Sequence, residues 1–189
     1  GFIMTWDLTT AKTRLNITGA TQDVEIQAAL DAALSLIESY CDRRFMHTPA
    51  QVETFVHESG PSVSLIRYPL DADPVFTGGA TNYKFHADWE NGVVHFDGGL
   101  AEHKLKVTYS GGYVTLPADL EFALWIVFDG VWASMSNAGA VSVGGVDKIS
   151  LVGVGSISYD TSNGGGGSVG GPITDYARDV LDTYRRTWA

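Results

Sequence analysis

The hydrophobic pattern is densest between Leu116 and Met135, where apolar side chains fall on every face of a predicted helix. One stripe recurs at helical spacing and consists of Leu120, Leu124, Val127, Val131 and Met135. A helix that is apolar all round must be enclosed on all sides, and this one is shorter than the roughly 20 apolar residues that cross a bilayer. The pattern predicts a central core helix, or a helix shared between subunits.

Large aromatic side chains of the same helix lie outside that stripe. Few other helices are predicted in this chain of 189 residues, so we expect neighbouring subunits to cover part of the helix. Aromatic residues are common anchors of such interfaces. The residues expected at a subunit interface are Phe122, Trp125, Phe128 and Trp132.

Helical spacing also marks both ends of the chain. Residues 7–19 predict a short helix with Asp7 as its N-cap, and residues 23–44 predict a longer one whose acidic start and basic end suit the helix dipole. Cys41 falls on its apolar stripe and is expected in the core. A final amphipathic helix, at residues 174–187, follows a glycine-rich run with the composition of a flexible linker. A terminal helix on such a tether is suited to docking into a partner's groove.

Between residues 49 and 109 the apolar period changes to two. Short alternating segments, separated by glycine, proline and asparagine turns, predict strands at 52–56, 63–67, 83–87, 94–96 and 105–109. Residues 148–153 and 155–159 predict a further hairpin. The fold class is therefore α+β: a small helical bundle with an inserted antiparallel β lobe and a C-terminal helix on a Gly-rich tether.

These elements divide the chain into five consecutive parts. We assign N-terminal bundle helices to 1–48, the β lobe to 49–115, the central bundle helix to 116–136, a Gly-rich loop with its hairpin to 137–172, and the C-terminal helix to 173–189.

Composition narrows the function. The net charge of -10 argues against a protein that wraps nucleic acid by neutralising phosphates. The single cysteine excludes an intrachain disulfide framework.

The segment 86–97 holds the densest group of potential metal ligands. A two-residue turn at Asn91 and Gly92 would set His86 opposite Asp97 and Asp88 opposite His95 on one sheet face. Imidazole and carboxylate can bind a metal, so a metal-dependent hydrolase using these four residues is one hypothesis. We favour the other interpretation, in which these pairs face solvent while the opposite face packs. The sequence has no HExxH, GxSxG or phosphate-loop motif. We therefore predict a non-enzymatic protein without a metal site or cofactor.

Three stretches carry a resemblance to a known family. They are residues 7–12 (Asp-Leu-Thr-Thr-Ala-Lys), residues 37–45 (Ile-Glu-Ser-Tyr-Cys-Asp-Arg-Arg-Phe) and residues 107–120, in which Tyr-Ser-Gly-Gly-Tyr precedes Leu-Pro and the apolar helix. In this order, with strands between them, the chain resembles the head-tail connector (adaptor) proteins of tailed bacteriophages. The resemblance covers residues 7–136 and extends loosely into the last helix.

The resemblance implies a ring, typically of twelve subunits, that lies under the portal protein and joins it to the stopper or tail while double-stranded DNA passes through without specific binding. It implies a virion-neck location, assembly in the host bacterial cytoplasm and no membrane partner. It also implies a portal-docking role for Tyr176, Val180, Leu181, Tyr184 and Trp188 of the last helix. A tail-completion or stopper protein of the neck is the alternative.

The acidic balance agrees with a DNA conduit, because a lumen of like charge repels phosphate. The acids expected to face the lumen are Asp71, Asp73, Asp88, Glu90 and Asp97.

Overall fold

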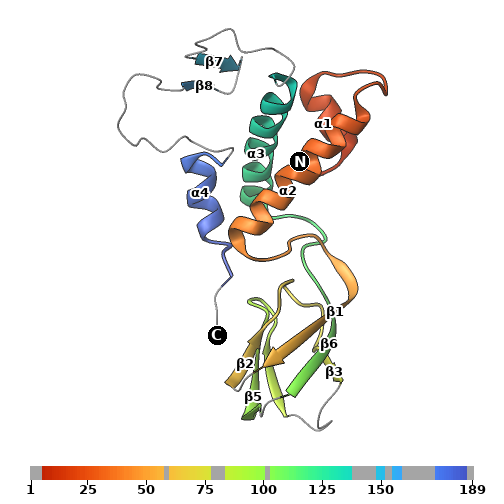
Figure 1. Cartoon of the computed structure of the whole chain (residues 1–189), viewed down its shortest axis with the longest axis vertical. Helices are drawn as coiled ribbons and strands as arrows, with labels where there is room; N and C mark the ends of the chain where they lie inside the picture. The colour runs from red at the N-terminus through yellow and green to blue at the C-terminus, as the bar shows by residue number, and fades with distance from the viewer. Residues whose placement is uncertain are drawn as a thin grey trace.

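The computed structural model describes residues 6–57, 60–77, 84–100, 103–137, 148–151, 155–158 and 173–186. In these residues the helices are α1 (Leu8–Leu15), α2 (Asp23–Cys41), α3 (Ala118–Asn137) and α4 (Asp175–Asp182). The strands are β1 (Thr48–His57), β2 (Gly60–Ser64), β3 (Val75–Thr77), β4 (Phe85–Asp88), β5 (Val93–Leu100), β6 (His103–Gly111), β7 (Lys148–Leu151) and β8 (Gly155–Ser158). Figure 1 shows the four helices gathered into a bundle and β1 to β6 forming a separate lobe at one end of it. The predicted α+β class is confirmed.

Capping fixes the ends of the first two helices. The Asp7 side chain accepts a hydrogen bond from the backbone N–H of Thr10 at 2.7 Å, which confirms the predicted N-cap. Helix α2 ends at Cys41, three residues before the predicted end, because Asp42 adopts a left-handed φ of 52°. Beyond this end the chain turns toward the β lobe, where the Arg44 N–H donates to the Ile66 carbonyl at 2.8 Å and the Arg43 guanidinium donates to the Tyr68 carbonyl.

A single protomer encloses most of α3. Trp125 is 1% exposed and Phe128 is fully buried. Helices α2 and α4 pack against α3, and the indole of Trp6 lies beside Trp125 with the two ring centroids 4.7 Å apart. The expectation that neighbouring copies must cover this helix is therefore wrong at these two positions. Trp125 and Phe128 are core residues of the protomer and leave the expected interface set. None of the described helices has the length and apolarity needed to cross a bilayer.

The β lobe consists of two antiparallel three-stranded sheets with the orders β1-β6-β3 and β2-β5-β4. Figure 1 shows β1, β6 and β3 on one side of the lobe and β2 and β5 on the other. Their inner faces share one apolar core, which includes Val63, Leu65, Val94, Phe96, Leu105 and Val107. Strand β3 was not predicted, because three residues are too short to show a period of two. The predicted hairpin of β7 and β8 is confirmed by their antiparallel pairing.

The β4–β5 register differs from the predicted one. The turn holds four residues, 89–92, so His86 pairs with His95 and Asp88 pairs with Val93. The Asp88 carboxylate accepts the backbone N–H groups of Glu90 and Asn91, both at 3.2 Å, and this bonding stabilises the longer turn. The predicted opposition of His86 to Asp97 and of Asp88 to His95 is therefore wrong.

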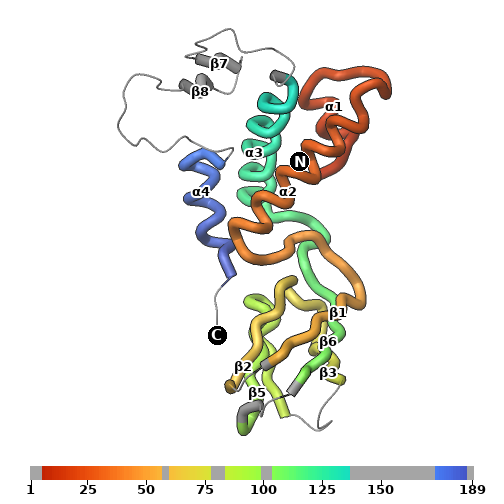
Figure 2. Tube along the Cα trace, viewed as in Figure 1, coloured from red at the N-terminus to blue at the C-terminus, as the bar shows by residue number. Residues whose placement is uncertain are grey.

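Figure 2 shows the chain passing between the bundle and the lobe after α2 and again before α3, and the segment after α4 running toward the lobe. Helix α4 ends at Asp182, earlier than predicted, and residues 183–186 run toward the lobe. There the backbone N–H of Arg186 donates to the carbonyl of Cys41 at 2.8 Å, and its guanidinium donates to the carbonyl of Ser64 in β2.

Candidate assembly surfaces

The apolar face of α4 is occupied by its own bundle. Leu181 is fully buried and Val180 packs against the bundle core. The Tyr184 ring lies edge-on to the Phe45 ring, with centroids 6.2 Å apart, and the Tyr184 hydroxyl donates to the Asp119 carboxylate at 2.7 Å. Burial, followed by this hydrogen bond, raises the pKa of Tyr184. The structure thus uses Leu181 and Tyr184 to hold the protomer together, whereas the resemblance implies docking residues there. Trp188 lies outside the described residues.

One exposed aromatic patch spans α3 and α4. Phe122 is 50% exposed and Tyr176 is 57% exposed, and their rings meet edge-on with centroids 5.8 Å apart. From sequence, Phe122 is expected at a subunit interface and Tyr176 at the portal, whereas the structure places the two side chains together. Two large rings that the protomer leaves open have the character of an interface anchor. We call Phe122 and Tyr176 the aromatic patch. Trp132, by contrast, is partly buried against the bundle core.

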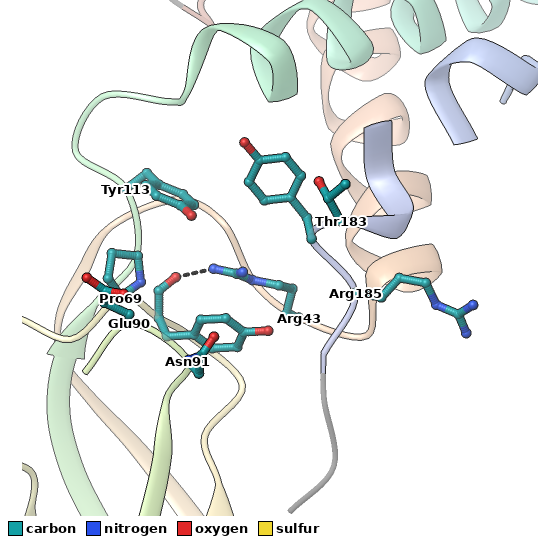
Figure 3. Close-up of a pocket in the computed structure, with 9 residues that line it drawn as sticks. Arg43, Pro69, Glu90, Asn91, Tyr113, Thr183 and Arg185 are labelled. Atoms are coloured by element: carbon teal, nitrogen blue, oxygen red, sulfur yellow. Dashed lines mark hydrogen bonds between the residues drawn. The ribbon is translucent and has the colours of Figure 1, made fainter. Parts of the chain in front are cut away.

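A pocket of about 460 Å³ lies where the bundle, the β lobe and the segment after α4 meet. Its lining residues are Arg43, Tyr68, Pro69, Glu90, Asn91, Tyr113, Thr183, Tyr184 and Arg185. Figure 3 shows Arg43 pointing into the junction toward the Pro69 loop, while Arg185 points away from it. This lining holds no histidine, cysteine or serine.

Arg43 is a structural cation within this pocket. It is 4% exposed, donates to the carbonyl of Tyr68, and sets its guanidinium 3.4 Å from the centroid of the Tyr68 ring and 4.8 Å from that of Phe45. Stacking on aromatic faces and bonding to a carbonyl are suited to a guanidinium. This role was not predictable from sequence, because Tyr68 and Phe45 lie in loops outside the helix that helical spacing reveals.

Four of the five acids expected at a lumen lie together on the lobe. Two hydrogen bonds join the loop at residues 70–74 to the β4–β5 turn. The Leu70 N–H donates to the Trp89 carbonyl at 2.8 Å, and the Trp89 Nε1–H donates to the Asp73 carboxylate at 2.8 Å. We call Asp71, Asp73, Asp88 and Glu90 the acidic cluster. Asp97 is not part of it, because it lies toward the other end of β5, where its N–H donates to the Lys84 carbonyl at 2.9 Å.

Two members of the acidic cluster have further partners. Asp71 accepts from His47 Nε2 at 2.8 Å. Hydrogen bonds, first from the Asn91 side chain and then from backbone N–H groups, lower the pKa of Asp88. These hydrogen bonds hold both carboxylates in place on the lobe surface.

The His–Asp group proposed for a metal is not assembled. His86 and His95 are exposed and paired across the hairpin, and Asp88 bonds to its own turn. Within the described ranges, no three His, Cys, Asp or Glu side chains are placed to hold a metal ion.

Comparison with known proteins gives a structural likeness. No family model and no curated relative matches the chain. A solved structure, the neck of an empty GTA (gene transfer agent) particle computed with C6 symmetry, contains a chain that is similar in fold. The TM-score is 0.59 at 13% sequence identity, and the match covers 96% of this chain and 90% of that chain. At this identity the likeness establishes a shared fold, nearly end to end.

Proposed function

We propose that this protein is a structural component of a phage-like neck, and more specifically the adaptor that joins a portal to the stopper or tail. The observation that carries the proposal is the shared fold with a neck chain across 96% of this sequence. A match of this extent includes the bundle, the lobe and α4 together, which a chance likeness of one small motif would not. The sequence resemblance to head-tail adaptors supports the same class independently.

In this role the chain forms a homo-oligomeric ring through which double-stranded DNA passes. A net charge of -10 keeps the protein surface from holding the phosphate backbone, so the duplex slides without specific binding. The role needs neither enzymatic chemistry nor a cofactor, because its work is binding between proteins. Trp132 stays in the proposed subunit interface, since part of its indole remains open.

We assign the portal contact to the aromatic patch. Tyr176 carries the docking role that the resemblance implies, and Phe122 joins it because the two rings touch. Buried aromatic anchors supply much of the energy of protein interfaces. The remaining apolar side chains of α4 hold this helix to α2 and α3, so the helix docks as part of the bundle and not as a free arm.

Co-expression with the portal protein of the same particle tests the assignment. The Phe122→Ala/Tyr176→Ala variant should lose co-purification with the portal while its thermal unfolding midpoint and secondary structure stay near those of the wild type. The matched control is Val24→Ala, which removes another exposed apolar side chain, 80% exposed and away from the patch. If the double variant still binds the portal, the assignment is contradicted. If the wild type binds the tail-side protein and not the portal, the stopper alternative is supported.

A further inference from the structure

Most positive charges of the described residues are already matched within the protomer. The ion pairs are Lys12–Asp23, Arg14–Asp129, Arg44–Glu38, Arg178–Asp175, Arg185–Asp182 and Arg186–Asp42. Arg43 and Arg67 donate to backbone carbonyls instead. Among the lysines and arginines whose side chains are described, Lys84, Lys104 and Lys106 remain exposed and outside any ion pair. All three belong to the β lobe.

Two of these lysines share a sheet face with exposed valines. In β6, Leu105 and Val107 point into the lobe core, so Lys104, Lys106 and Thr108 point outward. The register places Thr108 between Val52 of β1 and Val75 of β3, and it places Lys104 beside Val56 of β1. We call Val52, Val56, Val75, Lys104 and Lys106 the valine–lysine face.

This face is open in the protomer. Val52, Val56 and Val75 are 47%, 83% and 61% exposed, and all three lie on the outer side of one sheet. The solvent face of an antiparallel sheet is ordinarily polar. Apolar β-branched residues flanked by unpaired cations fit a protein surface that is partly apolar and carries carboxylates.

We propose that the valine–lysine face is the ring seam and docks against the acidic cluster of a second copy of this chain. The inference rests on the proposed ring and names the surfaces that close it. Copies with a net charge of -10 repel one another, so a seam between them needs cations that are not already neutralised internally. The valine–lysine face supplies such cations together with apolar area.

The second surface of the seam is the acidic cluster, because it gathers four carboxylates on the same lobe. Glu90 is exposed, and Asp71 keeps 48% of its side chain open beside His47. The two surfaces are different parts of the chain, so the contact is heterologous. Repetition of a heterologous contact produces a ring when the rotation closes. The proposal moves these four acids from the lumen to the seam.

Charge reversal with complementation provides the test. Self-association is measured by sedimentation velocity over a concentration series at low and at high ionic strength. The wild type should associate, and more weakly at high salt, because exposed ion pairs are screened. Lys104→Glu/Lys106→Glu and Asp71→Lys/Glu90→Lys should each stay monomeric. An equimolar mixture of these two variants should recover association, because each mutated surface then meets an oppositely charged one.

The matched control is Lys84→Glu, which reverses a third exposed lysine off the valine–lysine face and should associate like the wild type. The seam proposal is overturned by any of three results: the wild type stays monomeric, the reversal variants associate like the control, or the mixture does not recover association. A gel-shift assay tests whether the face binds double-stranded DNA instead. If Lys104→Glu/Lys106→Glu loses DNA binding while its self-association stays intact, the face is assigned to DNA and the seam proposal is overturned. These readouts need no portal, so a failed seam and a failed portal assignment are distinguishable.

Discussion

The helical bundle and the β lobe treat their apolar residues in opposite ways. The bundle holds the most apolar segment of the chain, yet it buries Leu124, Trp125 and Phe128 almost completely. The lobe is less apolar in sequence, yet it leaves Val56 83% exposed and Val75 61% exposed. The amount of apolar sequence therefore does not predict which apolar side chains stay exposed. A side chain stays exposed where its element has no neighbour on that side.

The difference follows from the geometry of the elements. A helix in a bundle can be covered by several neighbours at once, and α3 has α2, α4 and Trp6 around it. A sheet has two faces, and the second sheet of the lobe covers one of them. The outer face must then meet solvent or another molecule. The following substitutions test this contrast.

The largest expected effect is at the centre of the bundle. Trp125→Ala should lower the free energy of unfolding by about 3 to 5 kcal/mol, because it leaves a cavity among fully buried neighbours. Urea denaturation followed by circular dichroism measures it. Trp132→Ala is the matched control and should cost less, since that indole is only partly buried. Equal losses at both positions would show that the two side chains are equally enclosed.

A smaller effect is expected for the ion pair that ties α1 to α3. Arg14 donates two hydrogen bonds to Asp129, at 3.0 and 2.6 Å, and this bonding raises the pKa of Arg14. Asp129→Ala should lower the free energy of unfolding by about 1 to 2 kcal/mol, because the pair is partly buried and bidentate. Asp129→Asn keeps one acceptor and should lose less. An unchanged unfolding midpoint in Asp129→Ala would mean that water replaces the carboxylate at no cost.

The pH dependence of stability reports on Cys41. Its thiol is buried and lies 3.5 Å from the Leu181 carbonyl, and burial raises its pKa from 9.0 to about 12. Because the pKa of this thiol is higher in the folded state than in the unfolded state, it contributes stability that is fully present when the pH is below the unfolded-state pKa. That contribution is lost as the pH rises from about 9 toward 12. The stability advantage of wild type over Cys41→Ala should therefore shrink by about 1 kcal/mol between pH 8 and pH 10. A pH-independent difference between the two unfolding curves would contradict the buried neutral thiol.

The smallest effect is expected on the outer face of the lobe. Val56→Thr should change the free energy of unfolding by less than about 0.5 kcal/mol, because the side chain already meets solvent. Val94→Thr makes the same chemical change at a fully buried position of β5 and should cost about 1 to 2 kcal/mol for the buried hydroxyl. Thermal unfolding of the isolated protein compares them. A large loss for Val56→Thr would place this valine in the core.

Several features of the fold were predictable from local patterns. Helical spacing predicted α1, α2 and α3, and Asp7 was recognisable as an N-cap because a capping residue acts within one turn. The inserted β lobe followed from the change of period. Strand β3 and the β4–β5 register were not predictable in this way, because pairing with β6 defines the first and the Asp88 turn defines the second.

The candidate surfaces depended more strongly on the tertiary structure. The aromatic residue Phe122 was selected from sequence, but its contact with Tyr176 joins segments more than fifty positions apart, as the chain numbering shows. Arg43 belongs to the basic end of the helix predicted at residues 23–44, and the structure instead buries it against the ring of Tyr68. The valine–lysine face required the register of β1, β6 and β3, since each strand alone shows only alternation.

By itself, the sequence determined the class of fold, the places where helices and strands form, and the excess of negative charge. These properties arise from interactions between residues close in the chain, or from composition alone. The tertiary structure decided which apolar side chains stay exposed, which cations are already paired, and that the segment after α4 binds the bundle to the lobe. Exposure and charge pairing depend on which distant segments of the chain meet. Here other segments of the same chain bury most of α3, whereas no described segment covers the outer face of β1, β6 and β3.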